Sequence, residues 1–221
     1  IGSAGAGAID IFQIGTASAV GATGTTAIGN SSTGTLTLDG GIYNTTGAQT
    51  YTAATGGNNI VVAGGTDPLD AVAITTSNGA VKFLVADVTL NNGTTTTITS
   101  GGGAVEFGTS AAPVDIETNG GDNDSLVIAS GAGDVSFFGT IGVTNELGGL
   151  DVNAATAGTG DITFKGNIGT SAGGGNPGVN GTTSIGTATG AATDTENVHF
   201  LGSLYSFDVG VTTNAADADV S

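Results

Sequence analysis

Apolar and polar residues alternate in short runs along most of the chain, and four of these runs are nearly identical. They read GAVKF from Gly79, GAVEF from Gly103, GDVSF from Gly133 and GDITF from Gly160, at spacings of 24, 30 and 27 residues. In each run one polar residue separates an aliphatic residue from a phenylalanine, so both apolar side chains point to one side of a β-strand. These apolar pairs are Val81 and Phe83, Val105 and Phe107, Val135 and Phe137, and Ile162 and Phe164. The pattern predicts four equivalent strands, each entered through a glycine turn.

A second kind of strand lies before or between these motifs, in the segments LDAVAITT, APVDIET, DSLVIAS and GGLDVNA. Gly, Asn, Asp, Ser and Thr fill the gaps between strands, as they do in turns. No extended stretch has apolar residues at helical spacing. Self-similarity at a period in the twenties is typical of a repeat architecture.

Two all-β architectures, the antiparallel β-sandwich and the parallel β-helix, have many short strands. An antiparallel β-sandwich does not need the same residue type at the same place in every unit. In a parallel β-helix each turn stacks about 4.8 Å from the last, so equivalent residues form ladders through the core. We therefore expect a right-handed parallel β-helix, or β-solenoid, over residues 1–221, with β-sandwich repeats as the alternative. A period in the twenties would give about eight turns.

Two stretches fit the repeat poorly. Residues 170–198 contain no aromatic residue and few large apolar ones, so we expect a loop or an insertion that leaves the stack there. The first 40 residues match only through GAIDIF and GTLTLDG.

Composition narrows the partners and the compartment. The chain has 19 acidic and two basic residues and a net charge of −17, which disfavours nucleic acid and anionic membrane surfaces as partners. Only 10% of its residues are charged and 38% are hydrophobic, so we expect a folded protein and not a disordered acidic tail. The sequence has no cysteine, no apolar run long enough for a membrane helix and no visible signal peptide. We interpret it as a processed piece of a longer repeat protein.

Three segments carry a family resemblance: TTGAQTYTAA (45–54), DSLVIASGAGDVSFFGTIG (124–142) and ELGGLDVNAATAGTGDITFKGNIG (146–169). They resemble the β-strand repeats of filamentous-haemagglutinin-like adhesins and of related autotransporter passenger domains, which are very large bacterial surface proteins. The resemblance extends over residues 40–210 and implies export, a right-handed parallel β-helix and a rod or fibre at the cell surface.

Enzymes of this fold class act on polysaccharides, so catalytic residues must be considered. Lyases use arginine or lysine as the base and cations to neutralise the substrate, but the chain has no arginine, and Lys82 and Lys165 lie far apart in sequence. Hydrolases need paired carboxylates. Asp134 and Asp161 occupy equivalent motif positions, where we expect a surface acidic pair. We expect no enzyme and no catalytic residues.

Metal-binding candidates are few. The segment NGGDNDSLVI (119–128) resembles the calcium-binding Gly-Asp nonapeptide of exported toxins, although one residue is missing before the Asp. It makes Asp122 and Asp124 candidate calcium ligands, with a tight polar turn as the alternative. His199 is the single histidine and is expected to have a structural or surface role, because a zinc site needs further ligands. No other cofactor is expected.

The function that these features favour is an extracellular structural or adhesive one, as a rod, stalk or filament at the bacterial cell surface. Open strand edges at the ends of a β-helix need covering, so we expect head-to-tail self-association or continuation into further repeats. A surface glycan or a protein receptor is the expected ligand. A calcium-cross-linked surface-layer or matrix protein is the main alternative. A polysaccharide-acting enzyme and an ice-binding solenoid, the latter suggested by the run GTTTTITS (93–100), are less favoured.

Overall fold

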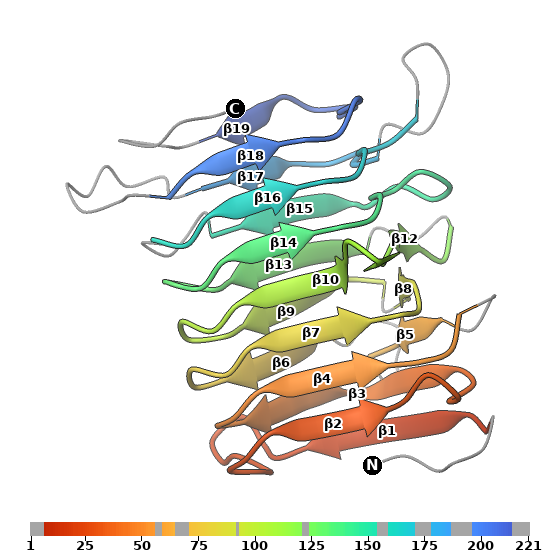
Figure 1. Ribbon diagram of the computed structural model, residues 1–221, viewed down its shortest axis with the longest axis vertical. Coiled ribbons are helices and arrows are strands. Elements are labelled where there is room, and N and C mark those ends of the chain that lie inside the picture. The colour runs from red at the N-terminus through yellow and green to blue at the C-terminus, as the bar shows by residue number, and fades with distance from the viewer. Residues whose placement is uncertain are drawn as a thin grey trace.

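A computed structural model describes residues 7–55, 59–64, 71–91, 93–120, 124–153, 159–170, 178–186 and 196–213. Within these ranges the chain forms strands and turns without a helix, and the strands stack in parallel as a β-solenoid (Figure 1). The near strands run to the right and the far strands return to the left as the chain climbs from N to C (Figure 1), which is a right-handed coil. The predicted parallel β-helix is therefore confirmed. β-Sandwich repeats are wrong, because the stacked neighbours are parallel.

Each turn of the coil contributes strands to three faces. The phenylalanine face consists of β2 (Thr26–Gly29), β4 (Gln49–Thr52), β7 (Val81–Leu84), β10 (Val105–Thr109), β14 (Val135–Phe137), β16 (Ile162–Phe164) and β18 (Val198–Phe200). The short-strand face consists of the first half of β3 (Leu36–Thr45), β5 (Ile60–Val62), β8 (Val88–Leu90) and β12 (Ile116–Thr118), continued by single bridges through Ile141, Ile168 and Tyr205. The threonine face consists of the second half of β3, β6 (Val72–Thr76), β9 (Thr95–Thr99), β13 (Ser125–Ala129), β15 (Gly149–Val152), β17 (Thr183–Ile185) and β19 (Val211–Thr213).

Two further strands complete the described fold. β1 (Ile9–Ile14) pairs in parallel with β3 along both of the faces that β3 crosses. β11 (Ala112–Pro113) turns back antiparallel on the end of β10.

The phenylalanine face gives the number of turns. Its seven strands follow one another from β2 to β18, so six turns lie between them. Paired residues in successive strands are 23 to 36 positions apart, and the longest step separates Phe164 from Phe200. The sequence-based figure of eight turns is too high, because two of these six steps, of 32 and 36 residues, are longer than the motif spacings of 24 to 30.

The predicted phenylalanine ladder is present in the core. Phe83, Phe107, Phe137 and Phe164 pair one above another and are 1% exposed. Their ring centroids lie 4.8 to 5.2 Å apart with interplanar angles of 3° to 7°, and Tyr51 and Phe200 extend the stack at its two ends. Each such contact contributes about 0.5–1.5 kcal/mol beyond burial. The partner ladder of Val81, Val105, Val135 and Ile162 is completely buried beside it.

Glycine is required where the chain turns from the threonine face to the phenylalanine face. A Cβ added to Gly133 would lie 2.1 Å from the Gly103 carbonyl oxygen, and one on Gly160 would lie 2.4 Å from the Gly133 backbone. The same contact recurs at five successive positions of the described stack, along a line that we call the glycine column: Gly47, Gly79, Gly103, Gly133 and Gly160. The first residue of each repeated motif is glycine because successive backbones approach too closely for any side chain.

Buried hydroxyl groups lie beside the glycine column. The Thr76 hydroxyl is shared between the carbonyls of Gly79 in its own turn and Ser100 in the next, and Ser100 repeats the pattern with Gly103 and Ser130. We call this line the hydroxyl corner; it consists of Thr45, Thr76, Ser100 and Ser130, all buried. Its hydroxyl groups donate to backbone carbonyls within one turn and in the next, so they join successive turns at this corner.

The expected loop over residues 170–198 is wrong for the part that the structure describes. β17 lies inside this range and pairs in parallel with β15 and β19. Its inward residues Thr183 and Ile185 are buried. A three-residue strand needs only one large apolar side chain to continue a ladder. The scarcity of aromatic and large apolar residues in this range therefore does not indicate a loop. Residues 171–177 and 187–195 lie outside the described ranges.

Candidate functional site

The outer surface of the threonine face carries small side chains in register. One row runs through Ala73, Thr97, Val127, Asp151, Ser184 and Thr212, each paired with the next across neighbouring strands. Asp151 is the charged residue of this row. Because outward residues alternate with the buried core residues along each strand, the row lies on the surface over six strands. Because these side chains are short, the row presents mainly hydroxyl and methyl groups close to the backbone of the sheet.

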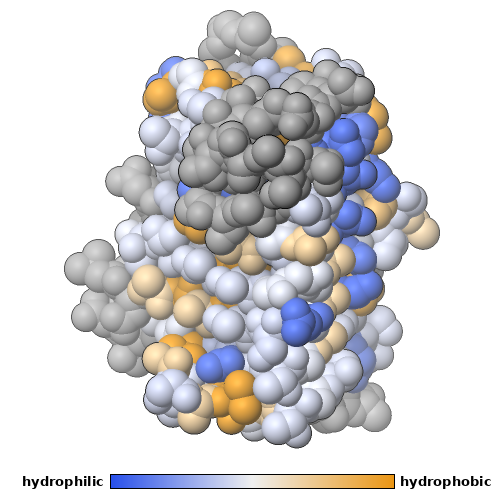
Figure 2. All heavy atoms as spheres, turned by 90° about the vertical axis from the view of Figure 1, so that its left-hand side faces the viewer, coloured by the Kyte–Doolittle hydropathy of each residue, from blue (hydrophilic) through white to orange (hydrophobic). Residues whose placement is uncertain are grey.

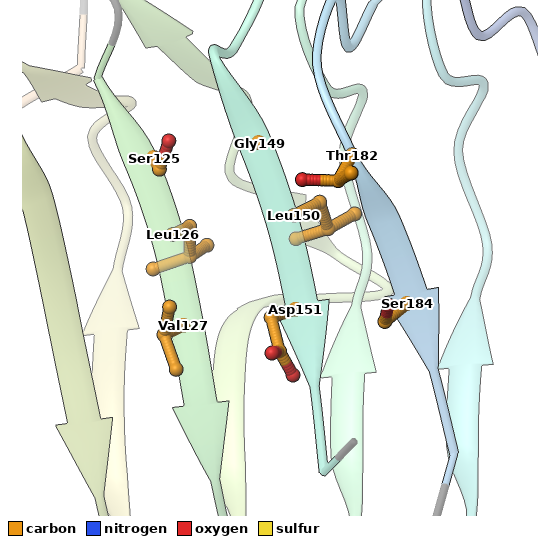
Figure 3. A pocket seen from close by; sticks show the side chains of 8 residues that line it. All are labelled: Ser125, Leu126, Val127, Gly149, Leu150, Asp151, Thr182 and Ser184. Atoms are coloured by element: carbon orange, nitrogen blue, oxygen red, sulfur yellow. The ribbon is translucent and has the colours of Figure 1, made fainter. Parts of the chain in front are cut away.

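A shallow hollow of about 170 Å³ interrupts this surface at β13, β15 and β17. Figure 3 shows its side chains, which come from these three strands and from Thr182 just before β17. The outward lining residues are Ser125, Val127, Gly149, Asp151, Thr182 and Ser184. Gly149 pairs with Ser125 and has no side chain, which leaves the space between Ser125 and Thr182 open.

The hollow combines hydroxyl groups, one carboxylate and one apolar side chain. Ser125, Thr182 and Ser184 can each donate and accept hydrogen bonds, whereas ionised Asp151 only accepts. Val127 adds an apolar wall. This set can bind a neutral ligand that presents several hydroxyl groups.

The outer surface of the phenylalanine face is more polar. Its central row runs through Thr50, Lys82, Glu106, Ser136, Thr163 and His199. Lys82 Nζ lies 2.9 Å from Glu106 Oε2, and Lys165 Nζ lies 3.8 Å from the centre of the Phe138 ring. Figure 2 shows hydrophilic residues gathered along this side of the molecule, at the right of the view. The lysines thus form surface contacts on the phenylalanine face, whereas the hollow lies on the threonine face.

Asp134 and Asp161 have a structural role. They stack as expected, and the Asp161 N–H donates to Asp134 Oδ1 at 3.0 Å. Asp161 Oδ1 in turn accepts from Asn197 N and Nδ2. Each carboxylate therefore binds the backbone of the next turn. The sequence signal is an Asp or Asn directly before the aliphatic-x-Phe strand, and the pattern alone indicates only a surface pair.

The candidate calcium ligands are only partly described. Asp122 lies outside the described residues. Asp124 is buried, and its Oδ1 accepts the Gly93 N–H at 2.7 Å. In the described ranges no three His, Asp or Glu side chains come together as a metal site would require. Calcium binding at Asp122 and Asp124 stays a prediction.

Glu117 was not singled out in the sequence, but it holds a turn of the chain. Its carboxylate accepts the N–H groups of Val143, Thr144 and Asn145 at 2.7 to 3.2 Å. Burial raises the pKa of Glu117 above its ordinary value, while the three backbone hydrogen bonds act in the opposite direction. No local motif marks this residue, because its partners lie 26 to 28 positions further along the chain.

No protein-family model matches the chain, and neither the curated proteins nor the solved structures contain a significant match. In the described part of the chain, no helix has the length and apolar character to cross a membrane. The molecule is thus established as a β-helix repeat protein by its own geometry.

Proposed function

We propose that this chain is a structural and adhesive segment of an extracellular rod or filament at a bacterial cell surface, without catalysis. The family resemblance of the filamentous-haemagglutinin type supports the location. The observation that supports the mechanical role most strongly is the unbroken aromatic ladder from Tyr51 to Phe200. It joins six successive strands of one face, so bending the stack would separate buried rings.

The ends of the described stack support association along the axis. At one end β1 presents Ile9, Ile11 and Ile14, which pack on the core but are only partly buried, and Phe12 is 65% exposed. At the other end Phe200, Tyr205, Phe207 and Val211 are partly buried in the same way. Leu201, at this end, is 61% exposed. Parallel strand edges and apolar cores at both ends suit head-to-tail contact with a second copy or continuation into further repeats.

Electron microscopy and light scattering over a range of protein concentrations test the rod. We expect particles that lengthen with concentration while their width stays constant. Phe12→Asp and Leu201→Asp should each shorten them, because a charge would be buried at the contact. Thr97→Asp, on the lateral threonine face, is the matched control and should leave length unchanged. Particles that stay monomeric at every concentration would disprove the filament.

Two further measurements test the location and the alternative. Antibody labelling of intact and of permeabilised producing cells should give equal signals if the protein is extracellular; signal only after permeabilisation would exclude that. A chelator separates the rod from a calcium-cross-linked lattice built through Asp122 and Asp124. The rod should keep its length in excess chelator, whereas a calcium-dependent lattice should dissociate.

A further inference from the structure

The hollow on the threonine face has the features of a small binding site. It exists because Gly149 has no side chain between Ser125 and Thr182. A Cβ at Gly149 would lie 3.1 Å from Ser125 Oγ and 3.4 Å from the Thr182 carbonyl oxygen. The backbone of Gly149 is outside the left-handed region, so its conformation in β15 does not require glycine. The missing side chain opens the surface without being needed for the fold.

We propose that this hollow binds one sugar ring of a neutral, hydroxyl-rich glycan. The proposal rests on the proposed function, since it supplies the adhesive surface of the rod with a ligand. Ser125, Thr182 and Ser184 offer hydroxyl groups from neighbouring strands, and these match a ligand whose own hydroxyls both donate and accept. Asp151 accepts hydrogen bonds from sugar hydroxyls, and a charged acceptor makes them stronger than neutral ones.

Charge selects a neutral glycan over an acidic one. The chain carries a net charge of −17, and Asp151 lies in the hollow itself. A uronate or sulfate group beside Asp151 would face a like charge at short range, which is unfavourable. A neutral sugar meets no such repulsion.

The volume of the hollow limits the part of a glycan that it can hold to a single sugar ring. Drug-sized ligands occupy pockets of about 300–1,000 Å³, and the 170 Å³ hollow is smaller. No aromatic side chain lines it, so a single ring gains little from stacking. We expect dissociation constants of about 1 mM or weaker, corresponding to about −4 kcal/mol. Many copies along a rod would raise the effective affinity for a glycan polymer.

Nuclear magnetic resonance titration of the full chain tests the site. The probes are four defined neutral hexasaccharides: maltohexaose, cellohexaose, chitohexaose and mannohexaose. At least one should shift the backbone amide signals of Ser125, Asp151 and Ser184 in a saturable way. Gly149→Ala fills the hollow, and Asp151→Asn removes the charged acceptor, so each should weaken binding at least tenfold. The amide spectra of both variants also report whether they are folded.

Two control variants change a glycine and an aspartate that lie outside the hollow. Gly24→Ala adds a methyl group where nothing lies within 4 Å, and Asp208→Asn removes an exposed carboxylate outside the hollow. Both should bind like the wild type. No saturable shift with any probe, or equal binding by Gly149→Ala, would overturn the site. Concentration-dependent shifts of the same residues without sugar would also overturn it, in favour of contact between copies. The rod would be unaffected by these failures, because it is tested by particle length.

Discussion

The phenylalanine ladder and the hydroxyl corner with its glycine column run the length of the same stack, but they hold it by different means. The ladder consists of large apolar rings, whose stacking contacts depend less strictly on direction than hydrogen bonds do. At the corner, hydroxyl groups meet particular carbonyls and glycines lie backbone to backbone. The ladder should therefore tolerate changes of shape that keep apolar volume, whereas the corner should not tolerate one added carbon. In a repeat of this kind, the turns restrict sequence more than the core does.

The largest effect is expected in the ladder when volume is lost. Phe107→Ala removes a buried ring that stacks on Phe83 and Phe137, and should lower the free energy of unfolding by about 3–5 kcal/mol. Phe107→Leu keeps much of the apolar volume and should cost clearly less. Urea denaturation followed by circular dichroism measures both. Equal losses for the two variants would show that ring stacking, and not apolar volume, holds the ladder.

The glycine column should respond strongly to a single methyl group. Gly133→Ala places a Cβ 2.1 Å from the Gly103 carbonyl oxygen, where backbone on both sides has to move, and should cost about 1–3 kcal/mol or more. Gly24→Ala, with nothing within 4 Å, is the control and should be neutral or slightly stabilising. The same denaturation assay compares them. A Gly133→Ala protein as stable as its control would contradict the close contact of the turns.

At the hydroxyl corner a smaller loss is expected from an isosteric change. Thr76→Val keeps the shape but removes the hydroxyl that donates to the Gly79 and Ser100 carbonyls. It should cost about 1–3 kcal/mol, because two hydrogen bonds at a buried position are lost. Thr97→Val, on the outward row of the threonine face, should change stability little. Thermal unfolding of the two variants side by side gives the difference. If Thr97→Val proved the more damaging, the corner would not be held by its hydroxyls.

The smallest effect concerns a turn held by a charged group instead of a hydroxyl. Because the pKa of Glu117 is raised in the folded protein, the protonated form is favoured by folding. Its contribution is therefore complete below the ordinary glutamate pKa and is lost as pH rises through the raised pKa. Unfolding free energies measured between pH 4 and pH 7 should fall with pH less steeply in Glu117→Gln than in the wild type. Identical slopes would show that burial of Glu117 does not affect its titration.

The ladder can be predicted from the sequence because its pattern is local. Gly133, Val135 and Phe137 lie within five residues, and their order alone states which side chains face inward and where the turn begins. The third face was less visible. β5, β8 and β12 read IVV, VTL and IET and share no repeated motif, and beyond β12 the face continues as single bridges, so no recurring pattern marks it in the sequence.

The candidate site was outside the reach of sequence patterns. Ser125, Asp151 and Ser184 are separated by 26 and 33 positions, and nothing local marks them as neighbours until β13, β15 and β17 pair in register. Asp134 and Asp161 show the same limit: their equivalence could be read from the motif, but not the backbone N–H that Asp134 accepts from the next turn.

By itself the sequence determined the class of fold, the inward side of the repeated strands and the glycine at each motif's start, because these depend on residues a few positions apart. The tertiary structure alone decided the number of turns, the place of β17 in the stack, the partners of the buried polar groups and the hollow at Gly149. Those depend on the register between turns, which is fixed by how many residues each turn uses, and on the phenylalanine face that number varies from 23 to 36.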